Sequence, residues 1–300
     1  MIPVLVNREG GTARARGAAL EEELRAAFDA AGVAIDLRLL PGLEIEAAAK
    51  ALRDEPLIVV GGGDGTLGTA AGVIARSRAA LGILPVGTRN HLARALGIPR
   101  DLSGAAKLIA GRPLRRIDLA RVNGHAFVNN AAVGFYPDLV KERERRDLPK
   151  LLATVPATFA VLKRLRHHRL RLDLPGGEQR VATPLLFVGN NRYSLDAGHL
   201  GEREALDDGL LSVFAVASHR RRQLIGFALR TLLGRADPER DFAAMGDAPR
   251  LTVTGHARSV SVALDGEVER MTFPLRFAVE PGGLTVIALP VEVERKSASA

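Results

Sequence analysis

The sequence has no cysteine among its 300 residues. It therefore has no disulfide framework, no thiolate nucleophile and no zinc site that uses sulfur, a composition that suits a reducing compartment. Aromatic residues make up only 4% of the chain, so few side chains are available for base stacking and we expect no nucleic-acid partner. No apolar run is long enough to span a membrane, and the N-terminus lacks the basic and apolar regions of a signal peptide. We therefore expect a cytoplasmic location.

Positive charge is in excess. Lysine and arginine total 42 against 34 aspartate and glutamate residues, for a net charge of +8, which favours an anionic partner such as a nucleotide or an acidic membrane. Two segments, 148–171 and 218–235, combine apolar residues at helical spacing with clustered basic residues, among them Arg220, Arg221 and Arg222. This pattern is typical both of a helix packed on a domain and of a helix at a membrane surface. We expect peripheral contact with an anionic membrane surface.

A glycine-rich turn follows the most apolar run of the N-terminal region. Residues 57–60 are apolar and mostly β-branched, which predicts a buried strand of a parallel sheet. Residues 66–75 have the pattern of a helix whose first N–H groups point back at the turn. A strand, a glycine turn and a helix N-terminus together favour phosphate binding. The candidate phosphate-binding residues of this turn are Gly61, Gly62, Gly63, Asp64, Gly65 and Thr66.

Asp64 is the charged side chain inside this turn. A carboxylate beside phosphates is repulsive unless a metal ion or a proton lies between them. Asp64 is therefore a candidate to hold Mg²⁺ or to accept a proton. The alternative is that Asp64 and Gly65 form an ordinary tight turn.

Other phosphate-binding motifs fit the sequence less well. Gly-Lys-Ser/Thr is absent from the sequence, which excludes a P-loop. Gly63, Gly65 and Gly68 have the spacing of a dinucleotide-binding turn. That turn requires an acidic residue about twenty positions further on. No aspartate or glutamate occurs between Asp64 and Asp101. The dinucleotide-binding alternative therefore requires an NADP-type site, in which an arginine replaces the acidic residue.

Predicted strands at residues 2–6 and 81–84 are each followed by a further loop. The carboxyl ends of parallel strands meet at one edge of a sheet, so we expect both loops to lie near the glycine turn. A threonine hydroxyl or an asparagine amide there can bond a phosphate or a ribose without adding charge, although either can instead cap a helix. The candidate nucleotide-binding residues of these loops are Asn7, Gly10, Gly11, Thr12, Gly87, Thr88 and Asn90.

The pattern of predicted elements divides the chain into two domains. Alternating strands and helices over residues 1–117 predict a doubly wound parallel sheet of the nucleotide-binding α/β class. Residues 118–292 contain short β-rich runs separated by turn signals such as Asn123-Gly124 and Asp265-Gly266, which predict an antiparallel β-sandwich. Two helical segments interrupt the sandwich, and its last strand can return to the first domain. Residues 293–300 are expected to form a disordered tail.

Several motifs together resemble the diacylglycerol kinase catalytic domain, a family that includes bacterial lipid kinases and sphingosine kinases and is related to NAD kinases. GGGDGT at 61–66 and LPVGTRNHLARAL at 84–96 carry the resemblance. FVNNAAVGF at 127–135, DDGLLSVFAV at 207–216 and LDGE at 264–267 extend it over nearly the whole chain. The resemblance implies an α/β nucleotide domain followed by a β-sandwich, with ATP and Mg²⁺ as cofactors and a lipid hydroxyl as acceptor.

The resemblance also implies roles for acids of the second domain. Asp208 and the Leu211 carbonyl are expected to be Mg²⁺ ligands. Asp265 and Glu267, with Asp64, compete for the role of catalytic base. From the residues alone, the pattern favours the acids of the second domain as solvated residues of hairpin turns. The sequence departs from the family pattern at Arg8, His91 and Ser212, where relatives usually carry proline, aspartate and aspartate.

The function expected from the sequence is that of an ATP-dependent lipid kinase acting on diacylglycerol, a long-chain base or a similar lipid alcohol. Two alternatives stay open: an NAD kinase-like enzyme with a small-molecule acceptor, and a non-catalytic regulator that binds nucleotide or lipid on the same fold. The sequence leaves the oligomeric state open, with a homodimer as one alternative.

Overall fold

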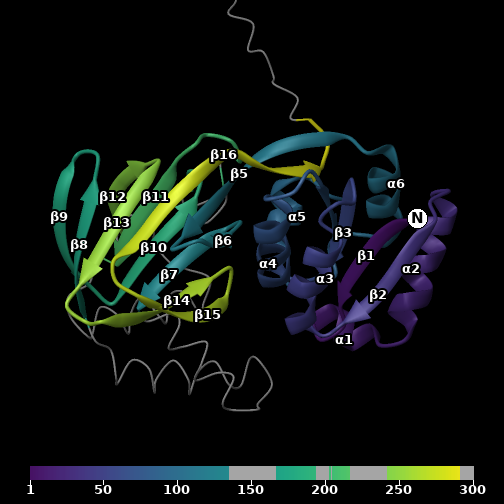
Figure 1. Cartoon of the computed structure of the whole chain (residues 1–300), viewed down its shortest axis with the longest axis horizontal. Helices are drawn as coiled ribbons and strands as arrows, with labels where there is room; N and C mark the ends of the chain where they lie inside the picture. The colour runs from purple at the N-terminus through teal and green to yellow at the C-terminus, as the bar shows by residue number, and fades with distance from the viewer. Residues whose placement is uncertain (135–166, 194–202, 204, 217–241, 291–300) are drawn as a thin grey trace, which may run out of the picture. The chain divides into compact units, whose positions relative to one another are not determined.

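The structure is a computed structural model that describes residues 1–134, 167–193, 203, 205–216 and 242–290 (Figure 1). It contains two compact units. Unit 1 comprises residues 1–63, 73–116 and 284 onward, and unit 2 comprises residues 64–72 and 117–283. The chain therefore passes from unit 1 to unit 2 between Gly63 and Asp64, inside the glycine turn, and the segment that begins with Asp64 groups with the C-terminal unit.

Unit 1 is built on a parallel sheet with the strand order β2-β1-β3-β4, and the last residues of β16 pair with β4. Val4 of β1 pairs with Val59 of β3, and Ile58 of β3 pairs with Leu81 of β4. Every residue of β3 and β4 is buried, as expected for parallel strands covered on both faces. The strands are β1 Ile2–Asn7, β2 Ile35–Leu40, β3 Leu57–Gly61, β4 Ala80–Leu84 and β16 Leu275–Ile287.

Helices alternate with these strands, as the sequence predicts. In α2, Leu20, Leu24, Ala27 and Phe28 are buried because they recur at helical spacing on one face. Helix α6 begins after Asp101, whose carboxylate accepts the Gly104 N–H at 2.7 Å as an N-cap. The helices are α1 Gly11–Arg16, α2 Ala19–Ala30, α3 Ile45–Ala51, α4 Asp64–Ile74, α5 His91–Ala95 and α6 Leu102–Gly111, with a short 3₁₀ turn at Gly42–Glu44.

Unit 2 is an antiparallel β-sandwich. One sheet has the order β12-β11-β10-β7-β14-β15, and the facing sheet contains the start of β16 followed by β13, β8 and β9. The core between them draws Val133, Val188 and Val213 from the first sheet, and Leu172 and Phe277 from the second. The strands are β5 Leu114–Val122, β6 His125–Phe127, β7 Asn130–Gly134, β8 His168–Leu174, β9 Gly177–Thr183, β10 Leu185–Asn190, β11 Leu211–Val216, β12 Phe242–Ala248, β13 Arg250–Gly255, β14 Ser259–Leu264 and β15 Glu267–Thr272.

The fold class predicted from the sequence is confirmed, an α/β parallel-sheet unit with a β-sandwich unit, but several elements differ in detail. The run at 126–133, predicted as one strand, is divided between β6 and β7. Strands β9, β12 and β15 were not predicted. Charged and polar residues interrupt the apolar pattern in β9 and β15, and β12 consists largely of small residues with an internal glycine. The predicted helices at 148–166 and 220–233 and the tail at 293–300 lie outside the described residues. Among the residues that the structure describes, no helix is long and apolar enough to cross a membrane.

Candidate active site

The three predicted nucleotide loops of unit 1 lie at the carboxyl ends of β1, β3 and β4. The Thr12 hydroxyl donates a hydrogen bond to the Gly87 carbonyl at 3.1 Å, which joins the loop after β1 to the loop after β4. A Cβ on Gly87 would lie 2.5 Å from the Gly63 Cα and 2.9 Å from the Gly62 carbonyl oxygen. The loops after β3 and β4 therefore pack backbone to backbone, and only glycine at position 87 permits this approach.

Asn90 shapes the loop after β4. Its amide nitrogen donates to the carbonyls of Pro85 at 3.1 Å and Gly87 at 2.9 Å, and its backbone is left-handed with φ 50°. The side chain makes no capping bond to helix α5. Because both amide donors are used within the loop, Asn90 holds Gly87 against Gly63. Thr88, predicted as a nucleotide contact, is exposed and lines a pocket of about 300 Å³ together with Arg89, Arg94 and Arg100.

The loop after β1 is closed by short side-chain contacts. The Asn7 carboxamide oxygen accepts the Glu9 N–H at 3.0 Å, and the Glu9 carboxylate accepts the Gly42 N–H at 3.0 Å. Arg8, Glu9 and Arg14 line a hollow of about 600 Å³ beside this loop. The arginine that replaces the family's proline therefore contributes positive charge to this hollow, beside the carboxylate of Glu9.

Asp64 is the first residue of α4 and belongs to unit 2. The Asn129 amide nitrogen donates to the Asp64 carboxylate at 3.1 Å. The guanidinium of Arg203 donates to the Asn129 carboxamide oxygen at 2.9 Å and to the Val128 carbonyl at 2.7 Å. Because a guanidinium only donates hydrogen bonds, Arg203 orients the Asn129 amide so that its nitrogen faces Asp64. The Asp64 carboxylate is therefore held by a hydrogen-bonded chain of three side chains.

Asp265 is a fixed support and not a mobile acid. Its carboxylate accepts the backbone N–H groups of Val128, Asn129 and Asn130 at 2.7, 2.8 and 3.1 Å. Burial raises the pKa of Asp265 to about 7; the three N–H groups lower the pKa, and the charge of Asp64 raises it further. Both oxygens of the Asp265 carboxylate therefore accept hydrogen bonds from the backbone of residues 128–130.

Glu267 lies against the first turn of α4. A Cβ on Gly65 would lie 2.5 Å from the nearest Glu267 carboxylate oxygen, and a Cβ on Gly68 would lie 2.5 Å from an Asp265 carboxylate oxygen. The two glycines thus let both carboxylates approach the helix that begins with Asp64. The pKa of Glu267 is raised, first by partial desolvation and then by the charge of Glu269. Glu267 is exposed, so its carboxyl is the more accessible proton acceptor of the two.

Tyr193 and Arg203 were not identified from the sequence, and Asn129 was included there only as part of the run at 127–135. The Tyr193 hydroxyl donates to the Asn129 carbonyl at 2.9 Å, and burial raises the pKa of this tyrosine. No local pattern marks either residue, because each acts through a partner more than sixty positions away in the chain. The FVNN motif was the one available signal, since it contains Asn129.

Asp208, predicted as a metal ligand, belongs to a separate polar network of unit 2. Its carboxylate accepts the Leu210 and Arg192 N–H groups and the Asn191 amide, at 3.1, 3.0 and 2.9 Å. The same Asn191 amide donates at 2.6 Å to Asp118, a buried carboxylate that sequence reasoning treated only as a domain boundary. Asp118 also accepts the N–H groups of Gly209 and Gly282. This network holds the loop before β11.

The structure indicates how far these residues fit Mg²⁺. Asp208 is partly exposed, and both of its carboxylate oxygens already accept hydrogen bonds. Leu211 lies within β11, paired with Asn190 and Ala248 on its two sides, so its carbonyl points into a strand ladder. Among the described residues, no group of three His, Cys, Asp or Glu side chains is placed to hold one metal ion. Mg²⁺ commonly binds through one or two carboxylates plus substrate phosphates, and a single carboxylate such as Asp64 or Asp208 fits that manner of binding.

Comparison with known sequences gives two family matches that together cover most of the chain. Residues 1–122 match the diacylglycerol kinase catalytic domain, and residues 140–288 match the YegS C-terminal NAD kinase β-sandwich-like domain. A protein of Pseudomonas aeruginosa named probable lipid kinase YegS-like is 36% identical over 234 residues, or 76% of this chain and 75% of the relative. A protein of the same name from Pseudomonas fluorescens is 31% identical over 279 residues, or 89% and 91%.

Solved structures share the fold. The crystal structure of a diacylglycerol kinase from Bacillus anthracis superposes with a TM-score of 0.67 at 22% identity, covering 96% of this chain and 97% of that one. Yeast NADH kinase in complex with NADH superposes with a TM-score of 0.54 at 11% identity, covering 100% and 89%. At these identities the likeness concerns the fold alone, which both kinds of kinase have in common.

Proposed function

This chain belongs to the diacylglycerol kinase family of YegS-like lipid kinases, and from that premise we propose that it transfers the γ-phosphoryl group of ATP to a hydroxyl of a lipid such as diacylglycerol or a long-chain base. The observation that carries the proposal is the arrangement around α4. Asp64, held by Asn129, and Glu267, laid against Gly65, share the helix turn that directly follows the phosphate-binding glycines.

The residues of this chain divide the work of phosphoryl transfer. The backbone N–H groups of Gly61, Gly62 and Gly63 favour the ATP phosphates. Glu267 accepts the proton of the lipid hydroxyl at its carboxylate. A carboxylate suffices because phosphoryl transfer passes through a loose transition state that makes a modest demand on the base. We assign this role to Glu267 and not to Asp265 because three backbone N–H groups hold the Asp265 carboxylate in place, whereas the Glu267 side chain is exposed.

Mg²⁺ is the cofactor that the family implies. When bound with ATP, it neutralises charge on the phosphates. Asp64 is the carboxylate next to the glycine turn and would hold the ion there, while Asp208 would hold one at the loop before β11. Asn129 and Arg203 keep the Asp64 oxygen pointing in one direction, which reduces the reorganisation that binding requires.

The proposal is tested with the purified full chain, labelled ATP, Mg²⁺ and a total lipid extract, and labelled lipids are identified by mass spectrometry. We expect a phosphorylated lipid to form. Glu267→Gln should lower its rate of formation by a factor on the order of a hundred or more, because the amide cannot accept the proton. ATP binding measured by calorimetry should be nearly unchanged, since Glu267 acts on the acceptor side.

Three results would contradict the proposal. Phosphorylation of NAD in place of any lipid would favour the NAD kinase-like alternative. Tight ATP binding without transfer to any acceptor would favour the non-catalytic regulator. Equal loss of ATP binding and turnover in Glu267→Gln would show that this residue supports the nucleotide and is not the base.

The pH dependence of turnover provides a separate prediction. The charge of Glu269 contributes to the raised pKa of Glu267. Glu269→Gln should therefore lower that pKa, keep the base ionised at lower pH and shift the acidic limb of kcat/KM to lower pH. The protonation of ATP affects the parent protein and Glu269→Gln equally, so it does not contribute to the difference between their pH profiles. Asp173→Asn, an exposed acid of β8, serves as the control and should leave the limb in place; an unchanged limb in Glu269→Gln would exclude Glu267 as the titrating base.

A further inference from the structure

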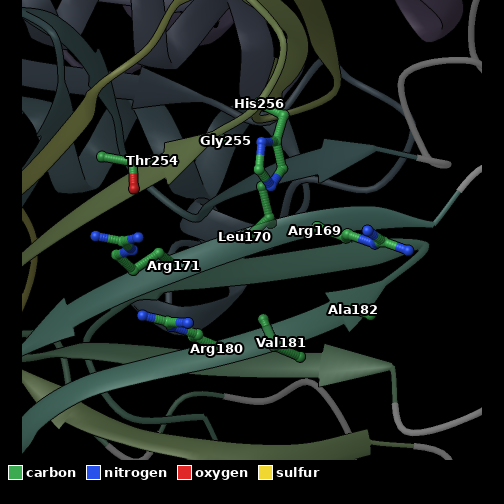
Figure 2. Close-up of a pocket in the computed structure, with 9 residues that line it drawn as sticks. All are labelled: Arg169, Leu170, Arg171, Arg180, Val181, Ala182, Thr254, Gly255 and His256. Atoms are coloured by element: carbon green, nitrogen blue, oxygen red, sulfur yellow. The ribbon is translucent and has the colours of Figure 1, made fainter.

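A basic groove lies on the outer side of the second sheet of unit 2, along β8, β9 and the end of β13 (Figure 2). Its volume is about 640 Å³. Its charged side chains are Arg169 and Arg171 of β8 and Arg180 of β9, and His256 follows β13. The described residues that line it include no aspartate or glutamate. We call this feature the β8–β9 groove.

Strand alternation directs the arginines outward. Leu170 and Leu172 of β8 are buried in the sandwich core, so Arg169 and Arg171, which alternate with them, face solvent. Arg171 pairs directly with Arg180 across the two strands, and Figure 2 shows their guanidinium groups near one another. Like charges at paired positions destabilise a sheet. The carboxylate of Glu178 lies near both arginines and offsets part of this repulsion, and a bound anion would offset more of it.

Internal ion pairs neutralise only part of this charge. Glu178 contacts Arg171 at 3.3 Å and Arg180 at 3.2 Å, so it cancels one of the two charges. Arg169 stands opposite Ala182 and makes no ion pair with a described residue. An adjoining hollow shares Arg169 and His256 and adds further histidines, again without an acidic residue among its described lining. The groove thus keeps a surplus of positive charge.

The spacing of the arginines favours binding of an extended anionic surface over binding of a single anion. Arg169 and Arg171 are two residues apart on a strand, roughly 7 Å. Figure 2 shows the Arg169 side chain pointing away from Arg171 and Arg180. The three guanidinium groups therefore do not converge on one phosphate. An extended anionic surface that presents a phosphate to each group satisfies them, and the planar guanidinium matches phosphate oxygens in pairs.

We propose that the β8–β9 groove binds the phosphate headgroups of an anionic membrane surface. The choice of lipid over another polyanion rests on the proposed function, since the acceptor of a lipid kinase lies in a membrane. Arg169 and Arg171 end the basic segment 148–171 in which the sequence predicts membrane contact, so the groove continues that segment into the described part of unit 2. Docking here is electrostatic and reversible.

The test is sedimentation of the full chain with vesicles of phosphatidylcholine alone and of phosphatidylcholine mixed with phosphatidylglycerol. We expect binding to the mixed vesicles only, weakening as salt is added. Changing Arg169, Arg171 and Arg180 together to Ser should lower the partition onto mixed vesicles by roughly a hundredfold, the effect of three basic residues at an anionic surface. The matched control changes Arg53, Arg76 and Arg78 of unit 1, all exposed, to Ser. It removes the same charge and should retain binding.

Kinase activity separates this proposal from the proposed function. With a short-chain acceptor dispersed in neutral detergent, the groove variant should turn over like the parent protein, whereas on mixed vesicles it should be slower. The proposal would be overturned if the parent and the groove variant bound mixed vesicles equally, or if the groove and control variants lost binding equally. It would also be overturned if the parent bound both kinds of vesicle equally. Complete displacement from vesicles by inorganic phosphate at constant ionic strength would likewise overturn it, since that result would make the groove a site for a single soluble anion.

Discussion

Asp64→Asn is expected to lower phosphoryl transfer by a factor on the order of a hundred or more while the protein stays folded. The carboxylate begins α4 directly after Gly61, Gly62 and Gly63, and Asn129, itself oriented by Arg203, donates to it. An amide at position 64 keeps the size of the side chain and an oxygen for the Asn129 bond. It loses the negative charge that can hold Mg²⁺ or organise the transferred group.

The measurement combines initial rates on the identified lipid with thermal unfolding of both proteins. Asp54→Asn is the control, since Asp54 is an exposed aspartate of unit 1; it should leave both quantities unchanged. Arg203→Lys adds a second check, because it keeps the charge but cannot bond Val128 and Asn129 with one planar fork. A folded Asp64→Asn protein with parental turnover would exclude Asp64 from the reaction and leave it as a residue of the turn.

Substituting alanine for Gly65 and for Gly68, two of the three glycines of α4, is expected to have opposite consequences. Alanine is favoured over glycine in a helix by about 1 kcal/mol, and Gly65, in the first turn of α4, is partly exposed. At Gly65 the new Cβ meets the Glu267 side chain, which is exposed and can rotate away. Gly65→Ala should therefore fold as well as the parent and lose turnover on the order of a hundredfold, because the displaced carboxylate no longer reaches the reacting hydroxyl.

At Gly68 the new Cβ meets an Asp265 oxygen that cannot move without giving up its bond from the Val128 N–H. Gly68→Ala should therefore lower the free energy of unfolding by about 2 kcal/mol, the cost of leaving a buried donor unpaired. Chemical denaturation and lipid kinase rates are measured on both variants. Gly111→Ala is the control, since a Cβ there meets only Pro113 at 3.8 Å at the end of α6. Loss of stability in Gly65→Ala with retained turnover would contradict the place given to Glu267.

Local patterns in the sequence were sufficient for features that depend on neighbouring residues. A buried apolar strand, a run of glycines and a helix follow one another within residues 57–75, so the strand, turn and helix that we propose to bind phosphate can be predicted from the sequence alone. The hairpin between β14 and β15 can likewise be predicted from neighbouring residues. Asp265 and Gly266 both have positive φ, 49° and 98°, which is the type I′ turn that an Asp-Gly pair favours.

The tertiary structure decided what each acid does. Asp265 and Glu267 are two positions apart and equally plausible as bases from sequence, yet Asp265 accepts N–H groups more than 130 residues away and Glu267 remains exposed. The orientation of the Asn129 amide is set by Arg203, 74 residues further along. Contacts of this kind leave no periodic signal, because one hydrogen bond requires only a suitable atom at the right place.

The same distinction applies to the basic groove. Charge excess and clustered arginines are properties of the sequence, and they indicate an anionic partner without locating it. Only the register of β8 against β9 places Arg171 opposite Arg180 and leaves Arg169 opposite Ala182. Composition thus determined the sign of the charge that this protein presents. The pairing of strands decided where the charge gathers, because register selects which side chains share a face of the sheet.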